Sequence, residues 1–103
     1  MEKEYKLRYL PMFEWDLAAA RDYIAFDLEN PIAAMRLVED TEAAIHKRLK
    51  NPLGYEPYRS KKDREHPYYR IYIRNYTVFY VVIENVMEVR RFTYSKRNIS
   101  EII

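Results

Sequence analysis

The sequence predicts an α+β domain with the element order β-α-α-β-β-β, in which a helical hairpin packs on one face of a small, mainly antiparallel sheet. Three observations predict this fold: an alternating segment near residue 4, two segments of helical period joined at Asn30-Pro31, and three strand-like segments after residue 67. A chain of 103 residues can bury one core but is too short for two, so residues 1–103 are predicted to form a single domain.

The segment from Glu4 to Leu10 alternates apolar and basic residues with the period of a half-buried strand. Pro11 ends this strand, and apolar residues then recur at spacings of three and four, which predicts an amphipathic helix of about four turns. The predicted core stripe of this helix is Phe13, Leu17, Ala20, Ile24 and Leu28, whereas Trp15, Asp16, Arg21 and Asp22 fall off it.

Asn30-Pro31 predicts the start of a second helix, because asparagine caps free amides and proline fits the first helical position. The predicted stripe of this helix is Ala34, Leu37 or Val38, Thr41, Ile45 and Leu49. The short connection between the two helices predicts that they lie antiparallel and place both stripes on a common surface.

The remaining strands follow an exposed connection from Tyr55 to His66. Tyr68 to Arg74 alternates, Tyr76 to Ile83 is apolar almost throughout as in a central strand buried on both faces, and Val86 to Thr93 forms the last strand. Tyr69, Tyr76 and Tyr80 are predicted to be core tyrosines with satisfied hydroxyls. The sheet face without helices is predicted to stay partly open, which makes it the expected site for a partner.

Charge divides the chain into two unequal parts. Residues 1–46 hold 5 Lys/Arg against 10 Asp/Glu, whereas residues 47–103 hold 13 against 6. The overall net charge of +2 therefore conceals a basic second half that can attract nucleic acid, the ribosome or an acidic protein segment to one face.

Composition excludes several kinds of chemistry. The chain has no cysteine, which excludes disulfides, thiolate catalysis and cysteine-based zinc sites, and its single glycine, Gly54, excludes Gly-rich phosphate loops. Neither His46 nor His66 has a second histidine at ligand spacing, so no metal and no other cofactor are expected. The charged start of the chain and the lack of a long apolar run predict a cytoplasmic protein without membrane contact.

Candidate contacts for nucleic acid or an acidic segment are the cations of the connection and of the last strands: Arg59, Lys61, Lys62, Arg64, Arg70, Arg90, Lys96 and Arg97. A guanidinium can fork onto phosphate or carboxylate, which favours function for Arg70 and for the Lys96/Arg97 pair. Arg74 and Arg91 are instead predicted to be solvated edge charges.

Two further side chains are candidates for chemistry or stacking. Tyr94 lies beside the Lys96/Arg97 pair and could stack on a base. His66 titrates near neutral pH and could act as a general acid or base, although a single loop histidine is more often just a loop residue. The residues alone predict an α+β domain with a cationic sheet face and leave its partner open.

Four segments span nearly the whole chain: YKLRYLP, LENPIAAMRLVEDTEAAI, YYRIYIRNYTVFYVV and VRRFTYSKRNI. In these segments the chain resembles the RelE/ParE family of toxins from bacterial type II toxin–antitoxin systems. The resemblance implies a growth-inhibiting toxin that is neutralised by a cognate antitoxin, whose partly disordered segment folds over the cationic face.

Two activities are known in that family. RelE-like members cut mRNA in the ribosomal A site without metal, by means of basic residues and often a tyrosine or histidine. ParE-like members bind DNA gyrase and poison it. If this chain is a nuclease, the resemblance implies catalytic roles for Lys96 and Arg97, with Arg70, Tyr94 and His66 as further candidates.

The chain departs from the nuclease pattern at two positions. Thr77 stands where RelE-like nucleases place an arginine in the central strand, and Ile103 stands where their C-terminal tyrosine would fall. The missing arginine and the long hairpin from Pro11 to Lys50 slightly favour a ParE-like gyrase inhibitor over a ribosome-dependent nuclease. A third interpretation, a non-toxic RNA-binding protein, would explain the basic sheet equally well.

Overall fold

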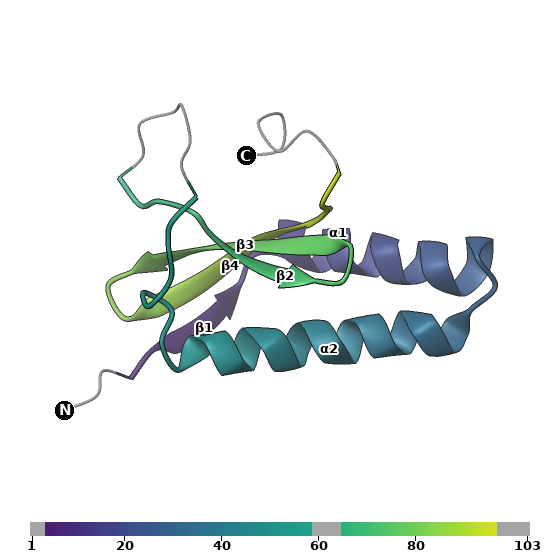
Figure 1. Ribbon diagram of the computed structural model, residues 1–103, viewed down its shortest axis with the longest axis horizontal. Helices are drawn as coiled ribbons and strands as arrows, with labels where there is room; N and C mark the ends of the chain where they lie inside the picture. The colour runs from purple at the N-terminus through teal and green to yellow at the C-terminus, as the bar shows by residue number, and fades with distance from the viewer. Residues whose placement is uncertain (1–3, 59–64, 97–103) are drawn as a thin grey trace.

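Two helices pack against a four-stranded mixed sheet, which confirms the predicted α+β class and element order (Figure 1). The computed structural model describes residues 4–58 and 65–96. The elements are β1 (Lys6–Tyr9), α1 (Pro11–Asp22), the short π-helix η1 (Tyr23–Asp27), α2 (Pro31–Leu49), β2 (Tyr69–Ile73), β3 (Tyr76–Ile83) and β4 (Val86–Tyr94).

The sheet has the strand order β1-β4-β3-β2. Strands β2, β3 and β4 form an antiparallel meander, and β1 joins it by pairing in parallel with β4, with Lys6 opposite Val86 and Tyr9 opposite Val89. β3 is therefore a central strand, as its unbroken apolar sequence predicts.

The stripe predicted for the first helix is right except at its end. Phe13 is buried, and Leu17, Ala20 and Ile24 pack against the core. Leu28 is exposed, contrary to the prediction, because the α-helix ends at Asp22 and the chain continues as the π-helix η1. The wider π turn rotates later residues out of the stripe's phase.

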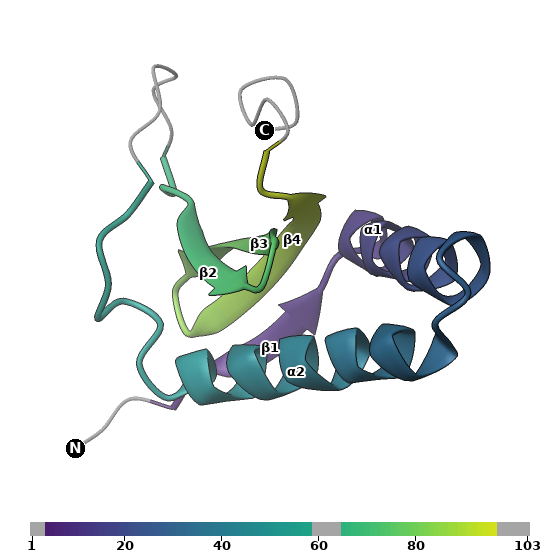
Figure 2. The same ribbon diagram turned by 45° about the vertical axis from the view of Figure 1, so that its right-hand side comes forward.

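α2 begins and packs as predicted. The side chain of Asn30 accepts a hydrogen bond of 3.1 Å from the amide of Ala33, and Pro31 occupies the first helical position. The buried residues of α2 are Ala34, Leu37, Thr41 and Ile45. Both helices cover the same face of the sheet, and the hairpin extends well past the ends of the strands (Figures 1 and 2).

The main core lies between the hairpin and the sheet, and its strand residues include Tyr69, Val78, Tyr80, Val89 and Phe92. The hydroxyl of Tyr80 donates to the carbonyl of Pro52 at 2.8 Å and accepts from Arg48 Nη1 at 3.0 Å. Burial raises the pKa of Tyr80 despite the nearby guanidinium, so this phenol stays neutral. Its hydroxyl is satisfied, as predicted for a core tyrosine.

A second, smaller cluster lies on the opposite face of the sheet. Tyr68, Phe79 and Val81 are buried there, with Tyr58 and Ile83 packed against them. The amide of Tyr58 donates to the carbonyl of Tyr68 at 2.6 Å, which places the connection beyond α2 alongside this face. Within the described residues, no helix is both long and apolar enough to cross a membrane.

Candidate functional site

Charged and aromatic side chains gather on the sheet face that the helices do not cover, which we call the open face. Strand pairing builds two rows across it. One row runs from Arg70 through Phe79 to Arg91, and the other joins Arg8 to Glu88. Because neighbouring strands lie about 4.8 Å apart, the first row places the backbones of two arginines within roughly 10 Å.

A β-bulge in β4 adds a further cation to this face. The register between β3 and β4 shifts at Phe79 and Tyr80, so that Tyr80 pairs with Val89 while Phe79 pairs with Arg91. Arg90 is the extra residue, and the bulge places two consecutive arginines opposite Phe79. It also lets both Val89 and Phe92 enter the helix-side core although an odd number of steps separates them.

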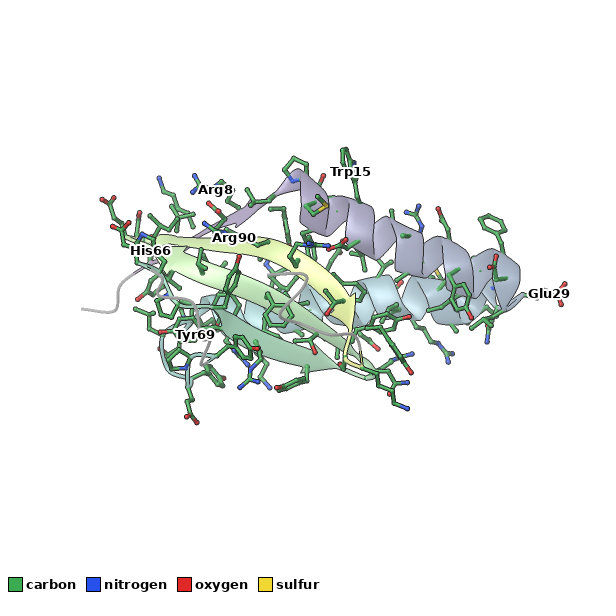
Figure 3. The ribbon with its side chains drawn as sticks, turned by 90° about the horizontal axis from the view of Figure 1, so that it is seen from above. Arg8, Trp15, Glu29, His66, Tyr69 and Arg90 are labelled. Carbon is green, nitrogen blue, oxygen red and sulfur yellow. The ribbon has the colours of Figure 1, made fainter. Side chains whose placement is uncertain are left out.

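A carboxylate joins two of the open-face arginines. Arg8 Nε and Arg90 Nε donate to the two oxygens of Glu88 at 3.0 and 2.9 Å. Burial alone would raise the pKa of Glu88, but the hydrogen bonds and charges of both guanidinium groups outweigh it and hold that pKa below its usual value. Glu88 is therefore ionised at neutral pH and neutralises part of this cationic surface. Figure 3 shows Arg8 and Arg90 over neighbouring strands at one end of the sheet.

Arg70 is surrounded by aromatic rings. Its guanidinium carbon lies 5.0 Å from the ring centroid of Tyr58 and 5.7 Å from that of Tyr72, which is mostly exposed. The carbonyl of Arg70 accepts a 3.0 Å hydrogen bond from Arg48, whose guanidinium stacks 3.4 Å above the ring of Tyr55. Arg48 thus ties the end of α2 to the strand that carries Arg70.

The two arginines predicted to be solvated edge charges are both ion-paired with the helices. Arg91 Nε lies 2.7 Å from Asp16 of α1 and is largely buried, so the prediction for Arg91 is wrong. Arg74 lies 2.6 Å from Asp40 of α2 and remains about half exposed. It is therefore solvated, as predicted, but it is also ion-paired. The first error arises because α1 packs against β4 and brings Asp16 to Arg91 and to the amide of Phe92.

A second concave feature lies on the helix side of the sheet. It is a groove of about 980 Å³ between the hairpin and the end of the sheet, and its lining includes Ala19, Tyr23, Leu28, Tyr76 and Tyr94. Burial, with the charges of Tyr94 and Tyr23, raises the pKa of Tyr76, so its phenol stays neutral. The groove is an apolar cleft with tyrosine hydroxyls, suited to a segment of another protein.

The predicted site residues do not form one constellation. Arg70 and Arg90 lie on the open face, whereas Tyr94 lines the groove on the other side of the sheet. Lys96 is exposed just beyond β4, and His66 lies before β2 with its Nε2 atom 4.0 Å from Glu65. The other predicted cations, Arg59, Lys61, Lys62, Arg64 and Arg97, fall outside the described residues.

Sequence reasoning missed the partners of the arginines. Glu88 pairs with Arg8 and Arg90, Asp16 pairs with Arg91, and the hydroxyl of Tyr68 accepts a hydrogen bond from Arg90. None of these partners was predicted as a site residue. One signal could have located the bulge: two arginines stand between Val89 and Phe92, which breaks strict alternation. Pairs between distant positions such as 8 and 88 leave no trace in a single sequence.

The open face can bind anions through Arg70, and flat rings can stack on its tyrosines. Among the described residues, no three histidine or carboxylate side chains gather to hold a metal ion.

Two solved toxin–antitoxin structures share this fold. One, described as the chromosomal ParDE TA system from P. aeruginosa, superposes with a TM-score of 0.71 at 16% identity and covers 91% of this chain and 99% of that chain. The other, the archaeal RelE-RelB complex from Pyrococcus horikoshii OT3, gives a TM-score of 0.53 at 13% identity and covers 92% and 99%. No curated protein sequence matches the chain.

The fold is thus that of the RelE/ParE toxins. A comparison with protein families shows to which of the two branches the chain belongs. Residues 7–99 match the family described as "ParE toxin of type II toxin-antitoxin system, parDE". The chain therefore belongs to the ParE toxin family, and it is a toxin of a type II toxin–antitoxin system. This confirms the expected toxin class and favours the ParE-like branch over the RelE-like one.

Proposed function

We propose that this toxin acts by binding and poisoning DNA gyrase rather than by cutting mRNA. The observation that carries the proposal is the neutralisation of the open face: Glu88 holds Arg8 and Arg90, and Asp16 holds Arg91. A ribonuclease needs cations directed at the scissile phosphate, so arginines already paired with carboxylates are poorly suited to the work.

The position of Thr77 supports the same proposal. In the central strand, where RelE-like nucleases place an arginine, Thr77 is almost fully buried, and its hydroxyl lies 2.9 Å from that of Ser95. A small, hydrogen-bonded side chain cannot contact a phosphate there. ParE-like members of the family inhibit gyrase, and membership of that branch makes gyrase the expected target.

The proposed partner in the cell is a cognate antitoxin, as in the two complexes whose fold this chain shares. The basic second half of the chain favours an acidic antitoxin segment that covers the open face. Arg70 and Lys96 are its proposed contacts among the described residues. We expect toxin, antitoxin and gyrase to meet in the cytoplasm.

Pulse labelling tests the choice of target. DNA and protein synthesis are followed within minutes of induction, with and without the neighbouring antitoxin, and purified gyrase is assayed for supercoiling and for trapped DNA cleavage. Early loss of DNA synthesis with translation intact, and inhibition of purified gyrase, would support the proposal. Early loss of translation with cleaved mRNA would refute it and revive the nuclease candidates Arg70, Lys96 and Arg97.

A matched pair of variants sharpens this test. Arg70→Ala removes the ring-stacked cation of the open face, and Lys47→Ala removes an exposed cation from α2. A gyrase poison that uses the open face only for the antitoxin should keep its toxicity in both variants, while Arg70→Ala weakens neutralisation. Loss of mRNA cleavage in Arg70→Ala alone would identify a nuclease.

A further inference from the structure

α1 and η1 carry a second apolar stripe beside the core stripe. Trp15, Ala19, Tyr23 and Phe26 follow one another at helical spacing, away from the stripe that begins at Phe13. Ala19 and Tyr23 of this stripe also line the groove, whereas Trp15 and Phe26 lie outside it. The side chain of Trp15 projects away from the rest of the molecule (Figure 3). Trp15 is 69% exposed, Tyr23 52% and Phe26 74%.

The exposed apolar surface continues around the hairpin tip into α2. Leu28 is 56% exposed and Ile32 60% exposed. We call Trp15, Tyr23, Phe26, Leu28 and Ile32 the hairpin surface. Single exposed apolar residues are ordinary, but several large ones along one projecting element mark an interaction site.

The π turn lies at the centre of this surface. The amide of Leu28 donates to the carbonyl of Tyr23 at 3.1 Å, five residues back, and none of Tyr23–Asp27 is buried. Ile24 of this turn packs against the core, whereas Tyr23, Phe26 and Asp27 are exposed. π turns within helices occur frequently at functional sites, where they reorient side chains.

Charge around the hairpin surface restricts what can occupy it. Residues 12–42 contain eight Asp/Glu and only two Lys/Arg. Glu14, Asp22 and Asp27 stand beside the exposed aromatic residues, and Glu29 lies at the hairpin tip (Figure 3). Such a surface repels nucleic acid, anionic membranes and a second copy of itself, as well as an acidic antitoxin segment that covers the open face.

We propose that the hairpin surface docks the toxin on its target protein, at a basic surface with apolar pockets that accept Trp15 and Phe26. The proposal rests on the proposed function, because it requires that the target be a protein. Aromatic side chains in apolar pockets are typical binding hot spots, and the acidic rim steers the approach to a basic partner. Antitoxin and target then use different sides of the molecule.

The test compares Trp15→Ser/Phe26→Ser with Leu53→Ser, which removes an apolar side chain of similar exposure from the connection after α2. Each toxin is assayed for growth inhibition, for thermal unfolding, and for affinity to purified antitoxin and purified gyrase. The hairpin variant should lose growth inhibition and bind gyrase at least about tenfold more weakly, with unchanged antitoxin affinity and thermal midpoint. Leu53→Ser should match the wild type.

A charge variant keeps the proposal testable if the double variant does not fold. Asp27→Lys reverses a charge on the hairpin surface, and Glu4→Lys makes the same change far from it. Asp27→Lys should bind gyrase several-fold more weakly, with the difference shrinking at high salt, and Glu4→Lys should not.

The outcomes separate this inference from the proposed function. Full toxicity of both the Trp15→Ser/Phe26→Ser and Asp27→Lys variants would overturn the docking role, even if wild-type toxin inhibits gyrase. Wild-type toxin that neither binds nor inhibits gyrase would refute gyrase as the target. Loss of toxicity in the hairpin variants, with antitoxin affinity intact, would then still support docking on a protein target through the hairpin.

Discussion

Asp16 is the side chain through which α1 is fastened to β4, and its removal should destabilise the toxin markedly. Its carboxylate accepts hydrogen bonds from Arg91 at 2.7 and 3.2 Å and from the amide of Phe92 at 3.1 Å. Asp16→Ala would remove the ion pair with Arg91 and leave the backbone amide of Phe92 without its acceptor.

The expected cost follows from these three contacts. Hydrogen bonds to a charged group are worth about 1.5–3 kcal/mol, and an orphaned amide adds roughly 1 kcal/mol. Side-chain exposures of 23% for Arg91 and 16% for Asp16 keep solvent screening small. The sum is about 3 kcal/mol, which in a domain of this size corresponds to a melting temperature lowered by roughly 10–20 °C.

Urea unfolding measures the effect, with Asp40→Ala as the control. The Arg74–Asp40 pair also joins a helix to the sheet, but its side chains are 47% and 54% exposed. Its loss should cost less than about 1 kcal/mol. The reasoning would be refuted if both variants lowered the urea midpoint equally, or if a double-mutant cycle between Asp16 and Arg91 gave a coupling below about 0.5 kcal/mol.

Three further substitutions test other contacts. Because arginine partners depress the pKa of Glu88 in the folded state, its stabilising effect is present above the unfolded pKa and is lost as pH falls through the lower folded pKa. Glu88→Gln should therefore destabilise the toxin at pH 7 and flatten the loss of stability in acid, as followed by urea midpoints from pH 7 to pH 3. Tyr80→Phe deletes the hydroxyl bonded to Pro52 and should cost about 1–2 kcal/mol in chemical denaturation, without altering the far-ultraviolet circular dichroism spectrum. Asn30→Ala removes the cap on the amide of Ala33 and should lower the free energy of unfolding by about 1 kcal/mol. Asn30→Asp keeps a capping oxygen and should retain most of that stability. Equal losses of stability in the two variants would exclude capping as the cause.

Local patterns predicted most of the fold. The apolar run Tyr76–Ile83 indicated the central strand, and Asn30-Pro31 indicated the start of α2 at the correct residue. Such signals depend on residues close in sequence, where hydrophobic period and capping chemistry act directly. The same patterns could not show that β1 lies parallel to β4, because that pairing joins the two ends of the chain.

The candidate site was less predictable, because its properties come from long-range pairs and backbone irregularities. Arg70 and Arg90 were expected on the cationic face and do lie on the open face. Tyr94 was expected to act with the neighbouring Lys96/Arg97 pair; the β-bulge changes the alternation of β4, and Tyr94 lines the groove. The π turn likewise moved Leu28 from the expected core into the solvent. In both cases one additional residue in a regular element decided which surface a side chain joins.

The pairing of β1 with β4 also has a consequence for how the toxin folds while the ribosome synthesises it. Lys6–Tyr9 is synthesised first, but its partner Val86–Val89 emerges only after the hairpin and the other strands have been made. Contacts between residues so far apart in sequence form late and slow the folding of a domain. A nascent chain therefore carries its finished hairpin before its sheet can close, and an interrupted chain that stops before β4 has neither Arg90 nor a complete open face. The delay gives a cognate antitoxin the opportunity to be present when the toxin completes its fold.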